Sequence, residues 1–560
     1  MNLFCCVLFG LFLLAPGLTG QQLSAAPATE NLARMHWLGL QQISLDTNSA
    51  QVMSVWRLPQ TAALVAQALD KFSRWPGQGA TNAASALLRP LLDDLVSSET
   101  YLEIRAPTSS QPRVASNPAS GGEGGSAPDH QLPTLNSQLA LVLALRLPAD
   151  RARLWQTNLA AALEALTGLR SVPVRNGWLL REHEAPDLIE FSRVGEWTLV
   201  GLGQKTNDLL TEFVARIARD PAPFARSATN FWLEADLNPS RLFPRLSTLN
   251  LPVLHSASAT EDQLVGAAKR SRDGSTLNRL RFTALGESGV ILTRGTFNFS
   301  HPLDLPLLPW KIPTNLIHEP LTSFTVARGL APWLVTTPVW QKLEFTPPPD
   351  QACSWTPWGD PFQTYFIVPL PAASNQLRQL AGRLVQNANP WLATNGEGFF
   401  QWSTNLSGIV WNGAFIALPQ IKPIIVNQQE YVLAGLVPFV NANSNPEPVE
   451  IRQAVLSTTN LVYYQFEQTD RRIEDGLFIT QLLRLLLHKS QLPAGGALWL
   501  KNLEPMLGDS TTFVAQTGTK QLTFDRKSTI GFTAFELHLI ADWLESPQFP
   551  YGLHTFSTPP

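Results

Sequence analysis

The segment Gly201-Leu-Gly203-Gln-Lys205-Thr206 is the nearest approach in this sequence to a loop that binds phosphate. It lies between a predicted strand and a predicted helix, where backbone amides and the positive end of a helix dipole could hold an anion. However, it lacks the third glycine of a dinucleotide-binding fingerprint and the spacing of a P-loop. We therefore expect Gly201, Gly203, Lys205 and Thr206 to form a tight strand-to-helix turn, and an anion site is the alternative.

The densest group of possible metal ligands is Glu182, His183, Glu184 and Asp187. In a strand, the two glutamates would share one face of the sheet while His183 would point to the other face. This alternation works against one ion contacting all three side chains. A solvated strand end before Pro186 is the preferred interpretation, so no metal site is predicted.

Other arrangements that support catalysis are missing from the sequence. It contains no Gly-x-Ser-x-Gly, Ser-x-x-Lys, His-Glu-x-x-His or Cys-x-x-Cys pattern. Asp93 and Asp94 are adjacent in a predicted helix, so their side chains diverge by about 100° and do not form an acid–base pair. Cys353 has no basic neighbour in the sequence, and we expect a small buried or half-buried side chain. No catalytic residue and no cofactor are predicted.

Tryptophan is unusually frequent, with seventeen Trp against six Tyr. Trp333, Trp340, Trp355 and Trp358 crowd a proline-rich region that includes Pro347-Pro-Pro349. Exposed Trp faces can stack on sugar rings or hold a proline-rich peptide. The same side chains could equally fill a core. Core packing is the preferred interpretation, and a ligand-binding surface formed by these four residues is the functional alternative.

The elements that would position these residues are clearest between Ser137 and Leu237. Apolar and polar residues there alternate first at strand spacing and then at helical spacing. The pattern predicts a strand at 139–147, a helix ending near Gly168, strands at 178–181, 188–193 and 196–202, a helix at about 207–219 and a strand at 231–237.

A similar pattern of predicted strands and helices occurs later in the chain, which suggests an internal duplication. Three short matches fall in the same order in both halves. They are Trp56 with Trp340, Leu147-Pro-Ala149 with Leu370-Pro-Ala372, and the segment 196–202 with the segment 430–436. We therefore predict an α+β fold with two related halves, residues 21–318 and 319–560, each a largely antiparallel sheet with helices packed on it.

Composition sets broad limits on function. The chain of 560 residues is long enough for several domains, but only 15% of the residues are charged and the net charge is −3. Because no basic field is present, nucleic acid is not an expected partner. Residues 107–136 are rich in Ser, Pro, Gly and Asn, so they are predicted to be a disordered insert at the tip of a hairpin.

The N-terminus contains an apolar run from Leu3 to Leu14, followed by small residues that include Thr19 and Gly20. Its length fits the apolar region of a signal peptide better than a membrane span of about 20 residues. No Lys or Arg precedes the run, yet residues 1–20 are predicted to be a signal peptide, with an uncleaved anchor or a wrongly assigned start as alternatives. No later segment reaches spanning length without charges or prolines. We therefore predict a periplasmic or extracellular protein with no membrane span after cleavage, in which only Cys353 remains and no disulfide forms.

Four segments carry a resemblance to other sequences: Met35–Leu40, Asn158–Leu166, Pro313–His318 and Ser323–Trp333. In these segments the chain resembles an uncharacterised group of exported proteins from bacteria of the planctomycete and verrucomicrobial kind. The resemblance implies a duplicated α+β envelope protein, and it implies no catalytic motif and no site residues.

These observations favour an extracytoplasmic, non-catalytic binding or scaffold protein. Its expected partner is a protein or a glycan of the cell envelope, met at a groove between the two halves. One alternative is an envelope hydrolase whose site is assembled from residues distant in sequence. Another alternative is a purely structural envelope protein. A catalytic site would bring carboxylates or a histidine together in a cleft, whereas a binding surface would expose an aromatic patch.

Overall fold

The computed structural model describes the chain from residue 29 to residue 546, and residue 549, with gaps. The residues outside the description within this span are 75–81, 108–138, 182–186, 205–207, 221, 225, 229, 247–276, 360–362, 396–397, 414–417, 438–445 and 487–493. The predicted signal peptide and nearly all of the predicted disordered insert, residues 107–136, therefore lie outside the described residues. Within the described part of the chain, no helix combines the length and the hydropathy of a membrane span.

The described residues form two compact units that do not follow chain order. The N-terminal unit contains the residues up to Leu45 together with Leu69–Thr283, and the C-terminal unit contains Asp46–Ala68 together with the residues from Ala284 onward. The first division falls within α4 (Pro59–Arg74), and the second falls within β9 (Leu277–Glu287). Residues 46–68 and 284–318, which the sequence placed in the first half, group with the C-terminal unit.

The N-terminal unit is built on an antiparallel sheet with the order β8-β1-β2-β3-β7-β6-β5-β4. Its strands are β1 (Thr29–Trp37), β2 (Thr100–Pro107), β3 (Ala140–Arg146), β4 (Ser171–Val174), β5 (Gly177–Arg181), β6 (Asp187–Val194), β7 (Trp197–Gln204) and β8 (Leu233–Leu237).

Successive side chains of a strand point to opposite faces of the sheet, and helices cover both of these faces. Leu145 and Leu147 belong to a core that includes Trp155 of α6 (Ala149–Thr167), with Leu91 of α5 (Asn82–Ser97) in the same cluster. Val142 and Ala144 point the other way and pack with α7 (Asp208–Arg219). The short helices α2 (Leu40–Ile43) and α8 (Pro239–Leu246) complete the unit.

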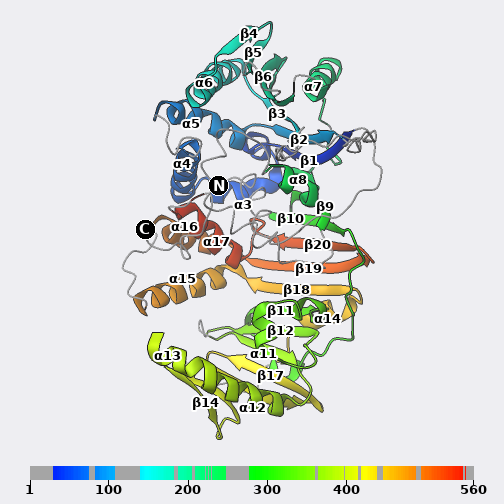
Figure 1. Ribbon diagram of the computed structural model, residues 1–560, viewed down its shortest axis with the longest axis vertical. Helices are drawn as coiled ribbons and strands as arrows, with labels where there is room; N and C mark the ends of the chain where they lie inside the picture. Colours follow the sequence, from blue (N-terminus) through cyan, green and yellow to red (C-terminus); the bar gives the residue numbers. More distant parts are fainter. Residues whose placement is uncertain are drawn as a thin grey trace, which may run out of the picture. The chain divides into compact units, whose positions relative to one another are not determined.

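The strands of the C-terminal unit also pair antiparallel, in the order β10-β20-β19-β18-β11-β12-β13-β17-β16-β15-β14 (Figure 1). Its strands are β10 (Val290–Phe299), β11 (Leu321–Arg328), β12 (Gln351–Pro357), β13 (Tyr365–Pro369), β14 (Phe399–Ser403), β15 (Gly408–Asn412), β16 (Gln420–Val426), β17 (Gln429–Gly435), β18 (Leu461–Gln468), β19 (Asp509–Gly518) and β20 (Gln521–Ser528).

Helices again cover two faces of this sheet. Val368 and Val432 pack with α12 (Ala373–Arg383), whereas Ile367 and Leu433 belong to a core that includes residues of α14 (Val449–Ser457). The other helices are α3 (Ala50–Trp56), α10 (Ala331–Leu334), α11 (Pro338–Leu343), the π-helical turn Leu384–Ala388, α13 (Asn389–Asn395), α15 (Thr469–Leu486), α16 (Ala494–Leu503) and α17 (Ala534–Glu545). The predicted α+β class, with antiparallel strands and packed helices, is confirmed.

Candidate functional site

The predicted glycine turn after the strand at 196–202 lies partly inside β7. Gly201 and Gly203 are buried within this strand, which continues to Gln204. A Cβ atom at Gly201 would lie 3.0 Å from Cδ2 of Leu210, so the glycine allows α7 to pack closely on the sheet. Lys205 and Thr206 lie outside the described residues.

The possible metal ligands are only partly described. Asp187 begins β6, while Glu182, His183 and Glu184 lie outside the described residues. Among the residues that the structure does describe, no group of three or more His, Cys, Asp or Glu side chains could hold a metal ion.

The four tryptophans of the predicted ligand surface have different environments. Trp355 is only 2% exposed and lies in the same core as Cys353, and Trp340 packs edge-on to Phe345 with 5.8 Å between the ring centroids. Trp333 and Trp358 are 62% and 54% exposed. Trp333 and Trp358 are therefore the two of the four that are largely exposed. Cys353 is buried as predicted, and its burial raises the pKa of the thiol.

Asp93 and Asp94 have separate structural roles. Asp94 is 6% exposed and accepts hydrogen bonds from the Arg151 guanidinium and, at 2.8 Å, from Nε1 of Trp155. It therefore fastens α5 to α6. Asp93 forms a surface ion pair at 2.8 Å with Arg89, one helical turn away. Their side chains diverge, as the sequence predicts.

The N-terminal unit contains a cavity of about 460 Å³ at one end of its sheet. This volume falls within the range of small-molecule sites, about 300–1,000 Å³. We call it the strand-end cavity, because its walls come from the ends of β3 and β6 and the residues just before β2 and β7, together with α2 and the end of α5. Its lining residues are Gln41, Gln42, Ser97, Ser98, Glu99, Arg146, Leu147, Pro148, Ala149, Arg193 and Glu196.

A chain of polar contacts between titratable side chains crosses the cavity wall. Nε2 of His36 lies 2.9 Å from Oε1 of Glu99, and Nη1 of Arg146 lies 3.5 Å from the other oxygen of Glu99. Nε of Arg146 also donates a 2.9 Å hydrogen bond to Glu196. His36 is fully enclosed behind this wall at 2% exposure. The wall is therefore pre-organised by direct contacts between residues from four separate segments.

The backbone holds these segments in register. The amide of Arg146 donates to the carbonyl of Glu99, and the amide of Leu147 donates to the carbonyl of Glu196, both at 2.9 Å. Glu99 and Glu196 therefore lie beside the end of β3. Burial pushes the pKa of Glu99 upward, but the hydrogen bond from His36 and the attraction of His36 and Arg146 outweigh it, so the pKa falls below its ordinary value. Glu99 stays ionised at neutral pH.

Two positive groups of the cavity remain open. Among the described residues, the guanidinium of Arg193 contacts no acceptor. Helix α6 begins at Ala149 beside the cavity, and no side chain caps its N-terminus. The first amides of a helix lack intrahelical acceptors and carry the positive end of its dipole. An anionic group could therefore bind between Arg193 and the start of α6.

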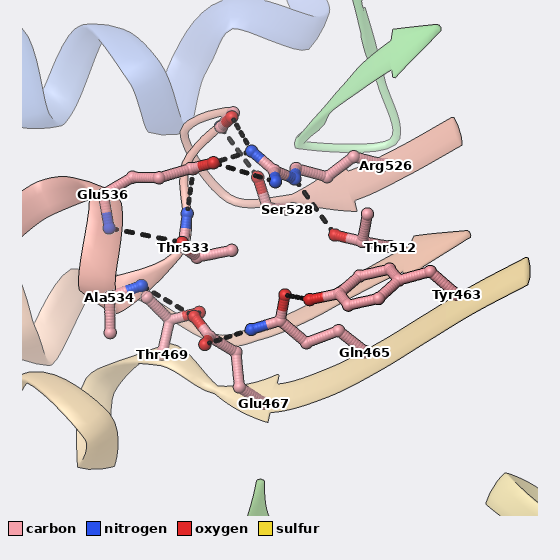
Figure 2. Close-up of polar contacts among 11 residues, drawn as sticks. Tyr463, Gln465, Glu467, Thr469, Thr512, Arg526, Ser528, Thr533, Ala534 and Glu536 are labelled. Carbon is pink, nitrogen blue, oxygen red and sulfur yellow. Dashed lines mark hydrogen bonds and ion pairs between the residues drawn. The ribbon is translucent and has the colours of Figure 1, made fainter. Parts of the chain in front are cut away.

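A second polar cluster lies in the C-terminal unit (Figure 2). Tyr463, Gln465 and Glu467 alternate along β18, so their side chains share one face. The Tyr463 hydroxyl donates to Gln465 at 2.7 Å, and the Gln465 amide donates to Glu467 at 3.0 Å. Glu467 also accepts from the Thr469 hydroxyl and from the backbone N–H of Ala534. Burial raises the pKa of Glu467 and raises that of Tyr463 to about 12.

The same cluster continues into the start of α17. Thr533 and Glu536 form a capping box, and Glu536 accepts hydrogen bonds of 2.7 and 3.0 Å from the Arg526 guanidinium. Arg526 also donates to the Thr512 hydroxyl at 3.0 Å. Every group named here has a partner within the protein, so the cluster fastens α17 to the sheet rather than presenting a site. We call it the α17 clamp.

A third feature is an apolar groove of about 270 Å³ in the C-terminal unit. Phe366, Phe400, Trp411, Ile421 and Leu436 are among its lining residues, on the sheet face that α12 partly covers. Phe366 and Leu436 are exposed. The groove could stack against a flat apolar ligand.

No protein family, no characterised protein and no solved structure matches the chain significantly. The strand-end cavity was not predicted from the sequence, since its charged residues come from four separated positions.

Proposed function

We propose that this chain is an exported, non-catalytic binding protein made of two copies of one α+β unit, and that its ligand binds in the strand-end cavity. The observation that carries the proposal is the open Arg193 guanidinium beside an uncapped helix start, within a wall that is otherwise held rigid by ion pairs. Pre-organised polar groups in a concave site are typical of ligand binding. Export rests on the apolar N-terminal segment and on the resemblance to exported proteins.

The order of the strands supports the duplication. In the N-terminal unit the order is β8-β1-β2-β3-β7-β6-β5-β4, and in the C-terminal unit the corresponding run is β18-β11-β12-β13-β17-β16-β15-β14. The two runs therefore visit their strands in the same order along the chain. Eight strands could be arranged in many other orders. The shared order, in which the third strand lies next to the seventh, is therefore a specific similarity between the two units.

The pairing register gives independent support. The amide of Leu147 donates to the carbonyl of Glu196 at 2.9 Å, and the amide of Leu370 donates to the carbonyl of Glu430 at 3.1 Å. These are the residues of two of the sequence matches. The first turn of a helix follows in both places, α6 in one unit and α12 in the other.

An irregularity in the sheet also recurs. Following the strand partners outward from Glu196 and Glu430 aligns Tyr101 with Cys353, and then His36 with Val326. The register of β1 shifts between Asn31 and Ala33, and that of β11 shifts between Leu321 and Ser323. The shift in β1 therefore lies as many residues before His36 as the shift in β11 lies before Val326. A bulge is a specific feature, so its recurrence at one place favours common descent of the units.

The binding function can be tested by native mass spectrometry of the purified protein after incubation with a small-molecule extract of cell envelopes. We expect a bound molecule that is released chemically unchanged on denaturation. Release of a converted molecule would favour the hydrolase alternative, and the lack of any bound molecule would favour the purely structural one.

A second candidate function is glycan binding at the apolar groove. The aromatic side chains of Phe366, Phe400 and Trp411 favour it, because sugar rings stack on aromatic faces. Titration with a panel of cell-wall oligosaccharides should quench tryptophan fluorescence in the parent protein and not in Trp411→Ala. Equal quenching in both proteins would exclude the groove.

A further inference from the structure

We propose that the strand-end cavity binds a small zwitterion of the amino-acid kind, with its carboxylate between Arg193 and the N-terminus of α6. The inference rests on the proposed binding function and adds the chemical class of the ligand. Three observations lead to it: the charges of the cavity, the contact made at the matching helix of the other unit, and the residues that replace the arginines there.

The C-terminal unit places a carboxylate of its own at the corresponding position. Oε2 of Glu430 accepts a 2.9 Å hydrogen bond from the backbone N–H of Ala373, the first residue of α12. A carboxylate is therefore the group that this type of helix start accepts in this protein. Such a hydrogen bond is favourable because the helix dipole and the free amide both attract negative charge.

Glu196, the counterpart of Glu430, does not reach its helix. Its carboxylate is held by Arg146 at 2.8 and 2.9 Å instead, so the start of α6 keeps no side-chain cap. Arg146 pairs with Trp197 across the sheet, and the matching pair in the other unit is Pro369 with Tyr431. Pro369 stands at the position of Arg146, so no arginine at that position draws Glu430 away from α12 among the described residues.

The second arginine follows the same pattern. Arg193 pairs with Thr198 in β7, and the matching pair is Pro423 with Val432 in β17. Proline carries neither charge nor a hydrogen-bond donor. Both cations of the strand-end cavity are therefore specific to the N-terminal unit. One arginine uncovers the helix start, and the other one adds an open positive charge next to it.

The same cavity also presents acceptors for hydrogen-bond donors on the ligand. Glu99 and Glu196 balance the two arginines, so the four charged lining residues sum to zero. Gln41, Gln42 and the two serines add neutral polar groups. A polyanion such as phosphate would be repelled by the two carboxylates, whereas an ammonium group would pair with them. A molecule with one carboxylate and one ammonium group matches both kinds of charge on the lining.

Isothermal titration of the purified protein with glycine, alanine, glycylglycine, acetate and inorganic phosphate tests the ligand class. We expect at least one of the three zwitterions to bind at or below about 10 mM and to bind more tightly than acetate or phosphate. Tighter binding of phosphate, or the lack of zwitterion binding at this concentration, would overturn the assignment. If the envelope extract still yields a bound molecule, the binding function stands and only the ligand class fails.

Arg193→Gln should weaken zwitterion binding by about tenfold or more, because a charged hydrogen bond to the carboxylate is lost. Arg175→Gln is the matched control, since Arg175 is exposed in the turn between β4 and β5 of the same unit. It should leave affinity unchanged. Equal affinities of the Arg193 variant and the parent would contradict the proposal.

A second pair of variants tests the uncapped helix. Arg146→Gln frees Glu196 to cap α6 as Glu430 caps α12, so binding should be lost while the fold is kept. The double variant Arg146→Gln, Glu196→Gln removes the competing carboxylate and should recover part of the affinity. If the double variant binds no better than the single one, the helix start does not hold the ligand.

Discussion

Glu467 and Ala534 lie 67 residues apart in the sequence, and a 2.7 Å hydrogen bond joins the backbone N–H of Ala534 to Oε1 of Glu467. The carboxyl group at the end of β18 thereby meets the first residue of α17. Because Gln465 and Thr469 donate to the same carboxyl group, one side chain satisfies three donors. These three hydrogen bonds satisfy a carboxyl group that is buried in this unit.

Glu467→Ala should lower the free energy of unfolding by about 2–4 kcal/mol, because three buried donors lose their acceptor. Chemical denaturation followed by tryptophan fluorescence measures the change. Glu450→Ala, at an exposed position of α14, is the control and should stay within about 0.5 kcal/mol of the parent. A change below about 1 kcal/mol for Glu467→Ala would show that the α17 clamp is not a stabilising feature.

Asp94→Ala and Asp93→Ala should differ strongly in stability, although the residues are adjacent. Loss of Asp94 leaves the buried Trp155 N–H and Nε of Arg151 without an acceptor, and about 2–4 kcal/mol is expected. Loss of the exposed pair between Asp93 and Arg89 should cost less than about 1 kcal/mol. Thermal unfolding of the two variants measures the contrast, and equal losses would rule out the role given to Asp94.

His538 predicts a pH dependence of stability. Burial lowers the pKa of His538 below its ordinary value, despite a hydrogen bond with the backbone of Ile473. The unfolded chain therefore takes up the proton first as the pH falls, and the native state is progressively destabilised below about pH 6.5 by up to about 1.4 kcal/mol per pH unit.

The free energy of unfolding of the parent protein and of His538→Gln should be measured between about pH 7.5 and about pH 5. As the pH falls, the free energy of unfolding should decrease more for the parent protein than for His538→Gln. A constant difference across this range would mean that His538 does not titrate differently in the two states.

Stability measurements can test which of the tryptophan side chains are buried in a core. Trp355→Ala should lower the free energy of unfolding by about 3–5 kcal/mol, because it leaves a large cavity in the core. Trp333→Ala and Trp358→Ala remove exposed side chains and should stay within about 1 kcal/mol of the parent. Denaturant titrations measure all three, and a small effect of Trp355→Ala would contradict its place in the core.

The strands and helices between residues 139 and 237 follow from the sequence pattern. Their apolar residues repeat at strand or helical spacing, and this local signal survives in the fold, as β5, β6, β7 and α7 show. The ends of the elements are harder to predict, so Gly201 and Gly203 lie in β7 rather than in a turn. No local signal could show that residues 46–68 group with the C-terminal unit, because that depends on packing between distant segments.

The strand-end cavity depends on register, which periodicity does not define. Glu99, Arg146, Arg193 and Glu196 meet because β2, β3, β6 and β7 lie in one order and at one offset. The sequence held one clue to their importance. Two of the three matches between its halves, at Leu147-Pro-Ala149 and at Glu196, lie on the wall of the cavity. As sequence patterns these matches indicate a duplication, but they carry no information on which segments lie beside each other.

Under the proposed duplication, Pro369 and Pro423 correspond to Arg146 and Arg193, which has a consequence for stoichiometry. A protein with two similar units would ordinarily be expected to take up two equivalents of a ligand. Here the second unit already fills its helix start with Glu430, so saturation should be reached at one molecule per chain, and binding should follow a simple hyperbola without cooperativity between the units.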